Sequence, residues 1–281
     1  MSVVATTLVW PGADQHGGAV ITLEHAAFGN RPDLLITTVP AAPRESWFAA
    51  VVLGAQGRYA RAATLLDELV QLQGDLGALA AATFASHRRQ LGGHAAARRL
   101  DALGLTKASG DEARSDVLLG LAADAIGAGR LDEARRLRDR APRTGWRARV
   151  RAGWVSAEID LSAGRADDAR PHAERALEDV GGSTRHRVKS EIVLGATLVD
   201  SDPAMARKLV TRARDDATDL CLLSLVWPAS LLLAQLDPDE ALTHRRCAAM
   251  ALHGVLRRAD PRGRELAERS PWVPSVTGPT G

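Results

Sequence analysis

The chain has 281 residues, of which 46% are hydrophobic, 25% are charged and only 4% are aromatic. This composition is typical of a folded, soluble protein whose core is packed mainly by small aliphatic side chains. Lys and Arg outnumber Asp and Glu by 36 to 34, an excess too small to favour nucleic acid as a partner. The two cysteines provide no disulfide framework.

The N-terminus lacks the features of a secretory signal, because Trp10 and Pro11 interrupt its first apolar stretch and no basic segment precedes it. No run of residues approaches the ~20 apolar positions that a membrane span requires. Of the 36 basic residues 33 are Arg, which indicates GC-rich codon usage. We therefore expect a cytoplasmic bacterial protein without membrane contact.

Residues 1–44 differ from the rest of the chain. Val3–Val9 and Leu34–Val39 are rich in β-branched residues and predict short strands or an extended arm. Ile21–Phe28 fits a short helix that ends at Gly29 and Asn30. Three roles stay open for this segment: it caps the first repeat, it supplies an edge for a homodimer, or it folds back along a groove as a pseudo-ligand.

Residues 45–258 show helical periodicity, and a short alanine-centred pattern returns six times in this span at intervals of 35 or 37 residues. Two antiparallel helices approach closely only where side chains are small, so the recurring positions predict the contact line of about six helix pairs. The anchor alanines are Ala62, Ala97, Ala134, Ala169, Ala206 and Ala241. Seven residues later stand Leu69, Gly104, Ala141, Ala176, Ala213 and Ala248, and twelve residues earlier stand Ala50, Ala85, Ala122, Ala157, Leu194 and Ala229.

Two kinds of turn precede the anchor alanines. Gly129 and Gly164 suit a left-handed residue that ends the first helix of a pair. Asp202 and Asp237, each followed by Pro, instead predict an N-cap at the start of the second helix. Asp237 and Glu240 have the spacing of a capping box.

Over residues 45–258 the pattern resembles the tetratricopeptide repeat family. The matching features are the small residue in the first helix, the Gly-Arg turn, and two alanines seven apart in the second helix, best seen in Gly129–Ala141 and Gly164–Ala176. The chain departs from the family in lacking most of its bulky aromatics and in having a period longer than 34 residues. The resemblance implies an all-α, right-handed superhelix of about six antiparallel helix pairs that binds a protein or peptide on its concave side.

In that register the first helix of each pair lines the concave surface. Arg151 and Trp154 share one helical face there, and Trp and Arg often carry the binding energy of an interface. For Trp154 the alternative is packing between adjacent repeats. We expect a non-enzymatic scaffold with no metal or cofactor, and the predicted partner-binding residues are Arg89, Leu119, Arg147, Arg151, Trp154, Glu158 and Glu191.

Eight arginines between Arg135 and Arg151 form the strongest local run of charge. The functional interpretation is a ridge that binds a phosphorylated or nucleotide ligand, which is our alternative function. The other interpretation is a solvated face whose charges pair with Asp132, Glu133 and neighbouring repeats. The arginines are Arg135, Arg136, Arg138, Arg140, Arg143, Arg147, Arg149 and Arg151.

The segment Asp215–Asp219 resembles the aspartate-rich motif with which isoprenoid synthases hold magnesium and diphosphate. A second acidic motif and an aromatic cavity are missing, so we expect these acids to solvate a turn. Residues 259–281 contain four prolines, which predict a flexible C-terminal tail in which Trp272 is the one large aromatic.

Overall fold

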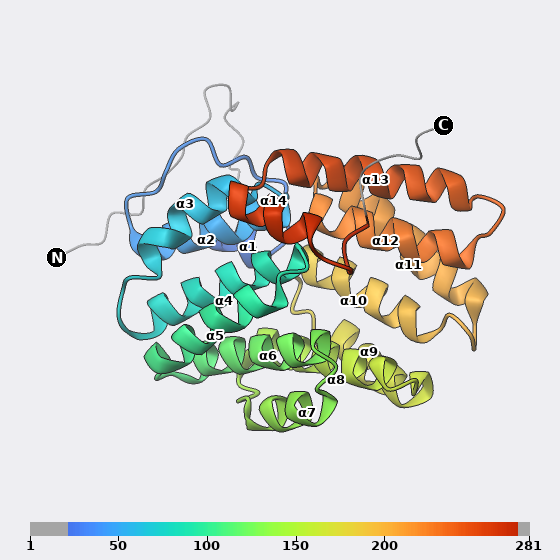
Figure 1. The fold of residues 1–281 in the computed structure, drawn as a ribbon, viewed down its shortest axis with the longest axis horizontal. Coiled ribbons are helices and arrows are strands. Elements are labelled where there is room, and N and C mark those ends of the chain that lie inside the picture. Colours follow the sequence, from blue (N-terminus) through green and yellow to red (C-terminus); the bar gives the residue numbers. More distant parts are fainter. Residues whose placement is uncertain (1–21, 275–281) are drawn as a thin grey trace, which may run out of the picture.

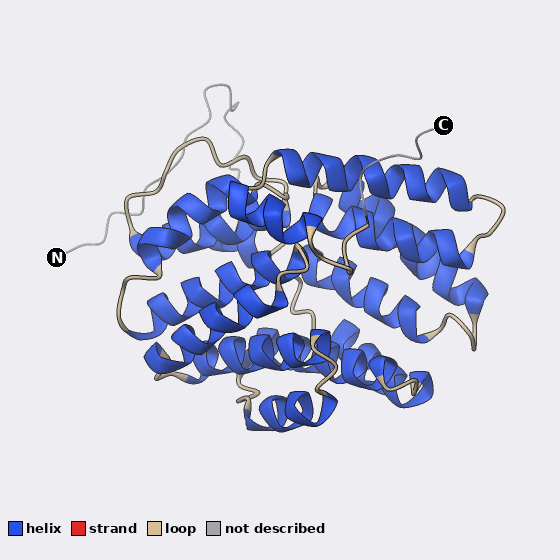
Figure 2. Ribbon diagram, viewed as in Figure 1, coloured by secondary structure: helices blue, strands red, loops and turns tan. Residues whose placement is uncertain are grey.

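A computed structural model describes residues 22–274, and every regular element in this range is a helix (Figures 1 and 2). The all-α prediction is therefore confirmed. The helices are α1 (Leu23–Phe28), α2 (Pro43–Ala55), α3 (Tyr59–Leu69), α4 (Gly74–Gln90), α5 (His94–Lys107), α6 (Asp111–Gly127), α7 (Leu131–Arg140), α8 (Gly145–Ser162), α9 (Ala166–Glu178), α10 (Thr184–Thr197), α11 (Pro203–Asp219), α12 (Leu223–Leu236), α13 (Ala241–Arg257) and α14 (Pro261–Glu268).

Helices α2 to α13 follow one another as six pairs, and the two helices of each pair contact each other. In the first four pairs a glycine in the left-handed conformation ends the first helix, with φ of +71° at Gly129 and +72° at Gly164. In the fifth pair the Asp202 carboxylate accepts a hydrogen bond from the Met205 amide at 3.0 Å, as an N-cap does. These turns lie where the sequence predicts them.

The predicted capping box of the sixth pair is wrong. Helix α13 begins at Ala241, and Glu240 occupies the N-cap position without a side-chain hydrogen bond. Pro238 lies in a turn before the helix, and its carbonyl accepts from the Ala241 amide at 3.4 Å. The Asp237 carboxylate lies 3.5 Å from the guanidinium of Arg207 instead, so it is committed to an ion pair with the neighbouring helix α11.

The recurring small residues are buried. Five of the six anchor alanines have no exposed surface, and all six residues that stand seven positions later are buried. Gly104 shows why size matters: a Cβ there would lie 2.9 Å from a methyl group of Val117 and 3.2 Å from the Ala78 carbonyl. We call these three columns, in which most residues are small, the alanine seam, and nearly all of their members are buried.

The first helices of the six pairs contact one another in sequence, and α12 also contacts α2, so the series closes into a ring. At the junction the Ser224 hydroxyl donates to the Ala55 carbonyl at 2.9 Å, and the Ala60 amide donates to the Arg258 carbonyl at 2.8 Å. Figure 1 shows the consequence, because the first and last helix pairs lie side by side.

The N-terminal segment lies against this ring. Helix α1 packs on α2 and α10, and the predicted short helix is confirmed. Of the two forms predicted for Leu34–Val39, a strand or an extended arm, the strand is not formed: these residues are irregular, and the Leu34 carbonyl accepts a hydrogen bond from the Gln56 side chain. The Val3–Val9 stretch lies outside the described residues.

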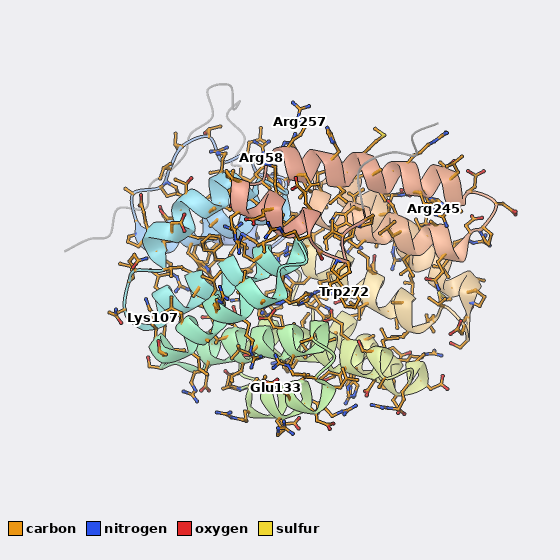
Figure 3. All side chains as sticks on the ribbon, in the orientation of Figure 1. Arg58, Lys107, Glu133, Arg245, Arg257 and Trp272 are labelled. Carbon is orange, nitrogen blue, oxygen red and sulfur yellow. The ribbon has the colours of Figure 1, made fainter. Side chains whose placement is uncertain are left out.

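The first part of the C-terminal tail is folded, which corrects the expectation of a flexible tail from residue 259. The Asp260 carboxylate caps α14 by accepting from the Gly263 amide at 3.1 Å, and it also pairs with Arg88 of α4 at 2.7 Å. Trp272 is 62% exposed and lies near the centre of the view in Figure 3, with its ring centroid 6.4 Å from that of His94.

The alanine seam predicts a large difference between two alanines on α11. Replacing buried Ala206 with Leu should lower the free energy of unfolding by about 1–3 kcal/mol, because the added atoms have no space between the helices. Ala204→Leu, on the exposed face of the same helix, should change it by less than about 0.5 kcal/mol. Urea unfolding followed by circular dichroism measures both, and equal effects would contradict the role of the seam.

Candidate functional site

The candidate site is the inner face of the ring, where side chains of α4, α6, α8 and α10 meet. Five of the seven residues predicted to bind a partner lie in this region, and each contacts another part of the same chain: Arg89, Arg147, Arg151, Trp154 and Glu158. Leu119 does not belong to it, because its side chain is buried in the core between α6, α7 and α8. The helical register predicts that Leu119 faces a groove, but α7 and α8 cover its side chain.

One network of the inner face joins α6 to α8. Arg147 donates to the Asp116 carboxylate at 2.6 Å and to Glu112 at 2.5 Å. Arg151, one turn later, donates to the Asp116 carbonyl at 3.3 Å, and its guanidinium lies 3.6 Å from the same carboxylate. Burial opposes ionisation of Asp116, but the two arginines outweigh it and hold its pKa below the ordinary value. Asp116 is therefore a buried anion that interacts with two cations, Arg147 and Arg151.

A second buried network involves Arg89 at the end of α4. Its guanidinium donates to Asp101 at 2.5 Å and to Asp124 at 2.8 Å, so one arginine bridges α5 and α6. Burial raises the pKa of Asp101 well above its ordinary value, against the opposing influence of Arg89, and the nearby Asp124 raises it further. Two carboxylates thus share one guanidinium through its Nε and Nη2 atoms.

Aromatic rings surround His186 on α10. The Trp154 ring stacks on it at 5.4 Å with an interplanar angle of 16°, and the Trp154 indole donates to Ser190 at 2.9 Å. Lys189 lies 4.4 Å from the Trp154 ring centre and 3.7 Å from the Glu158 carboxylate. Trp154 is only 7% exposed, so the packing interpretation of this tryptophan describes its place in the structure.

Glu191 is also buried, with 1% of its surface exposed, and does not face an open groove. Its carboxylate accepts from Arg187 at 2.8 Å and from Arg212 at 2.9 Å, which ties α10 to α11. The helical register placed it on the concave surface, but the two arginines and the neighbouring helix enclose it.

Phe28, which the sequence analysis did not select, enters this region from α1. Its ring lies 5.5 Å from that of Trp47, 5.9 Å from Phe48 and 6.3 Å from His186. The Arg147 guanidinium lies over its face at 4.2 Å. The only sequence signal was a single aromatic residue just before the Gly29-Asn30 stop, and nothing local indicated which helices it would meet.

The segment after α1 is held through its backbone. Gln56 donates to the carbonyls of Pro32 and Leu34, both at 2.9 Å, and the Ser46 hydroxyl donates to the Pro40 carbonyl at 2.9 Å. The Thr184 amide donates to the Gly29 carbonyl at 3.1 Å. Residues 22–42, which we call the N-terminal strap, therefore cover part of the inner face. These contacts fit two of the roles left open by the sequence: a cap on the first repeat, since Gln56 and Ser46 lie on or at the end of α2, and a segment that folds back along the groove, since Thr184 begins α10.

The structure divides the eight arginines of the predicted ridge between the inner face and the surface of α7 and its neighbours. Arg147 and Arg151 point into the inner face, as described above. Arg135, Arg138 and Arg149 form ion pairs with Asp132, Asp139 and Asp179 at 2.7, 2.7 and 2.9 Å. Within residues 22–274, three of the eight arginines have no carboxylate within 4 Å: Arg136, Arg140 and Arg143.

The aspartate-rich segment lies on α11, the second helix of its pair. Asp215 pairs with Arg214 at 2.6 Å, and Asp216 pairs with Arg187 at 2.8 Å. In the part of the chain that the structure describes, no three His, Cys, Asp or Glu side chains are arranged to hold a metal ion. Each of these two acids has a structural partner.

Comparison of the sequence with known proteins identifies no relative. Neither the models of known protein families nor the curated protein sequences searched match the chain. Among the helices of residues 22–274, none is both long and apolar enough to cross a lipid bilayer.

The position of His186 predicts a loss of stability in mild acid. Burial, followed by the nearby cations Arg185, Arg147, Arg151 and Lys189, holds its pKa well below the ordinary value. Below pH about 6.5 the imidazole of His186 is therefore protonated in the unfolded chain but neutral in the folded chain. As the pH is lowered, this group reduces the free energy of unfolding by up to about 1.4 kcal/mol per pH unit.

Urea unfolding between pH 7 and 5 measures this effect. His186→Gln should show a shallower decrease than the wild type, whereas His253→Gln, on the exposed face of α13, should follow the wild type. Because burial also lowers the pKa of His87, to about 3, part of the decrease should persist in His186→Gln. Parallel curves for His186→Gln and the wild type would exclude this assignment.

Proposed function

We propose that the protein is a non-enzymatic scaffold, a right-handed superhelix of antiparallel helix pairs like that of the tetratricopeptide repeats, which binds a protein or peptide on its inner face. Contacts between equivalent positions of successive repeats support the architecture, since bonded residues are often 35 or 36 apart. Examples are Arg89 with Asp124, Arg98 with Glu133, Arg147 with Glu112 and Trp154 with Ser190.

The observation that carries the proposed function is the way in which the inner face holds the N-terminal strap. An aromatic anchor, Phe28, enters a cluster of rings beneath a guanidinium, and the irregular residues that follow are bound through their carbonyls. Peptide recognition by strand addition uses the same two kinds of contact: a side-chain pocket gives specificity, and hydrogen bonds to the main chain give affinity. The strap thus resembles a ligand that is covalently attached.

A partner segment with an aromatic residue would take the place of the strap. The strap has the advantage of high effective concentration, because it is tethered to α2 by the chain itself. A partner must therefore bind more tightly than the strap, or bind when the strap has left. The partner is a protein or peptide, and a second copy of this chain satisfies the same chemistry.

Phe28→Ala in the full-length protein tests this proposal, with a fluorescent synthetic peptide of residues 22–42 as the probe. Loss of the ring weakens the strap in cis, so the variant should bind the peptide at least tenfold more tightly than the wild type does. Fluorescence anisotropy measures this difference. Leu35→Ala, on an exposed part of the same strap, should bind the peptide as weakly as the wild type.

A peptide in which Phe28 is replaced by Ala should not bind to any of these proteins. If the Phe28→Ala protein keeps its helical circular dichroism and still fails to bind the native peptide, the strap is part of the core and the inner face is not a peptide site.

A further inference from the structure

Three surface cavities lie at related positions of successive repeats, beside the second helices of the third, fourth and fifth pairs. The first runs along α7, the second lies between the turns that precede α9 and α11, and the third runs along α11. Their volumes of about 610, 470 and 660 Å³ are in the range of small-molecule sites. Because the repeat forms all three cavities, the charges that line them decide what each can bind.

The three cavities differ in charge. Three arginines and two acids line the first, one arginine and three aspartates line the second, and three cations and three aspartates line the third. Of the three, the cavity along α7 alone has a net positive lining. We call it the α7 cavity, and its charged residues are Arg130, Asp132, Glu133, Arg136 and Arg140.

Both acids of the α7 cavity are already engaged in ion pairs. Asp132 lies 2.7 Å from Arg135. Glu133 accepts a hydrogen bond from Arg98 of α5, and its carboxylate lies 3.1 Å from Arg130. The Nη1 atom of Arg98, on the guanidinium that binds Glu133, is buried and has no hydrogen-bond partner. The acids therefore leave the other two arginines of the lining without a counter-charge.

Those two arginines are Arg136 and Arg140. They are exposed, stand one turn apart on α7 and line the same cavity. Within residues 22–274 neither has a carboxylate within 4 Å. Like charges four residues apart on a helix repel each other. A multivalent anion beside both side chains relieves this repulsion, and guanidinium groups bind phosphate oxygens through paired hydrogen bonds.

We propose that the α7 cavity binds the phosphate groups of a small phosphorylated ligand, with Arg136 and Arg140 as the phosphate-binding residues. Leu131 and Leu137 line the same cavity and offer an apolar surface to the rest of the ligand. The site lies outside the inner face, since α7 is not one of the helices that form it (Figure 1). It therefore goes beyond the proposed binding of a peptide.

Isothermal titration of the full-length protein with inorganic pyrophosphate, at fixed ionic strength and pH 7.5, tests the proposal. The wild type should bind one equivalent, and the double variant Arg136→Gln with Arg140→Gln should weaken binding at least tenfold. Because both side chains are exposed, this variant should keep the helical circular dichroism of the wild type.

The matched control is Arg245→Gln with Arg246→Gln, which removes the same charge from two exposed positions of α13. Arg245 lies well apart from Glu133 of the α7 cavity in Figure 3. This control should bind pyrophosphate as tightly as the wild type does. An equal loss of affinity in both double variants would show a response to net charge alone and would overturn the proposal.

Adenosine diphosphate, as a second titrant, should compete with pyrophosphate, because it presents a diphosphate to the same arginines. Binding of pyrophosphate without binding of adenosine diphosphate would reject a phosphorylated organic ligand. Absence of binding of either compound to the wild type at millimolar concentration would overturn the proposal as a whole. The peptide assay with Phe28→Ala reports separately on the scaffold function, since Phe28 does not line the α7 cavity.

Discussion

Close approach of helices at small side chains is the constraint on which the rest of the structure depends. Along the alanine seam helices meet without bulky residues between them, and few aromatic residues are needed to fill the core. The repeated spacing places each helix pair in a similar relation to the next, so that the first helices contact one another in order. The inner face, with its arginines and its aromatic cluster, exists because that relation is maintained over six pairs.

The inner face combines two kinds of interaction that usually occur separately. Buried ion pairs connect successive repeats, as between Arg89 and Asp124 and between Arg147 and Asp116. Beside these ion pairs, His186 and Trp154 belong to an aromatic cluster, and Phe28 of the strap packs against it. On the function proposed above, a partner segment is bound by an aromatic anchor and by polar contacts to its backbone.

Local features of the fold could be predicted from the sequence, and long-range ones could not. Gly129, Gly164 and Asp202 specify their turns through their own backbone preferences, and the anchor alanines were identified because their period is regular. Asp237 shows the limit of this reasoning, since an arginine on the neighbouring helix engages its carboxylate. Leu119 and Glu191 lie on the expected helices but are covered by neighbours. Helical periodicity identifies a buried face without showing whether an open groove or another helix lies opposite.

Closure of the ring changes how such a repeat array should unfold. In an open array the terminal repeats have one neighbour and open first. Here the first pair contacts the last through the hydrogen bond of Ser224 to Ala55, and Asp260, which caps α14 after the last pair, binds Arg88 of the second pair; each bond joins residues about 170 positions apart. Formation of these bonds requires the whole intervening chain to be ordered, and the entropy of closing so long a loop delays them until late in folding. Once they form, neither end of the array is free to fray, and the six pairs are expected to unfold as one cooperative unit.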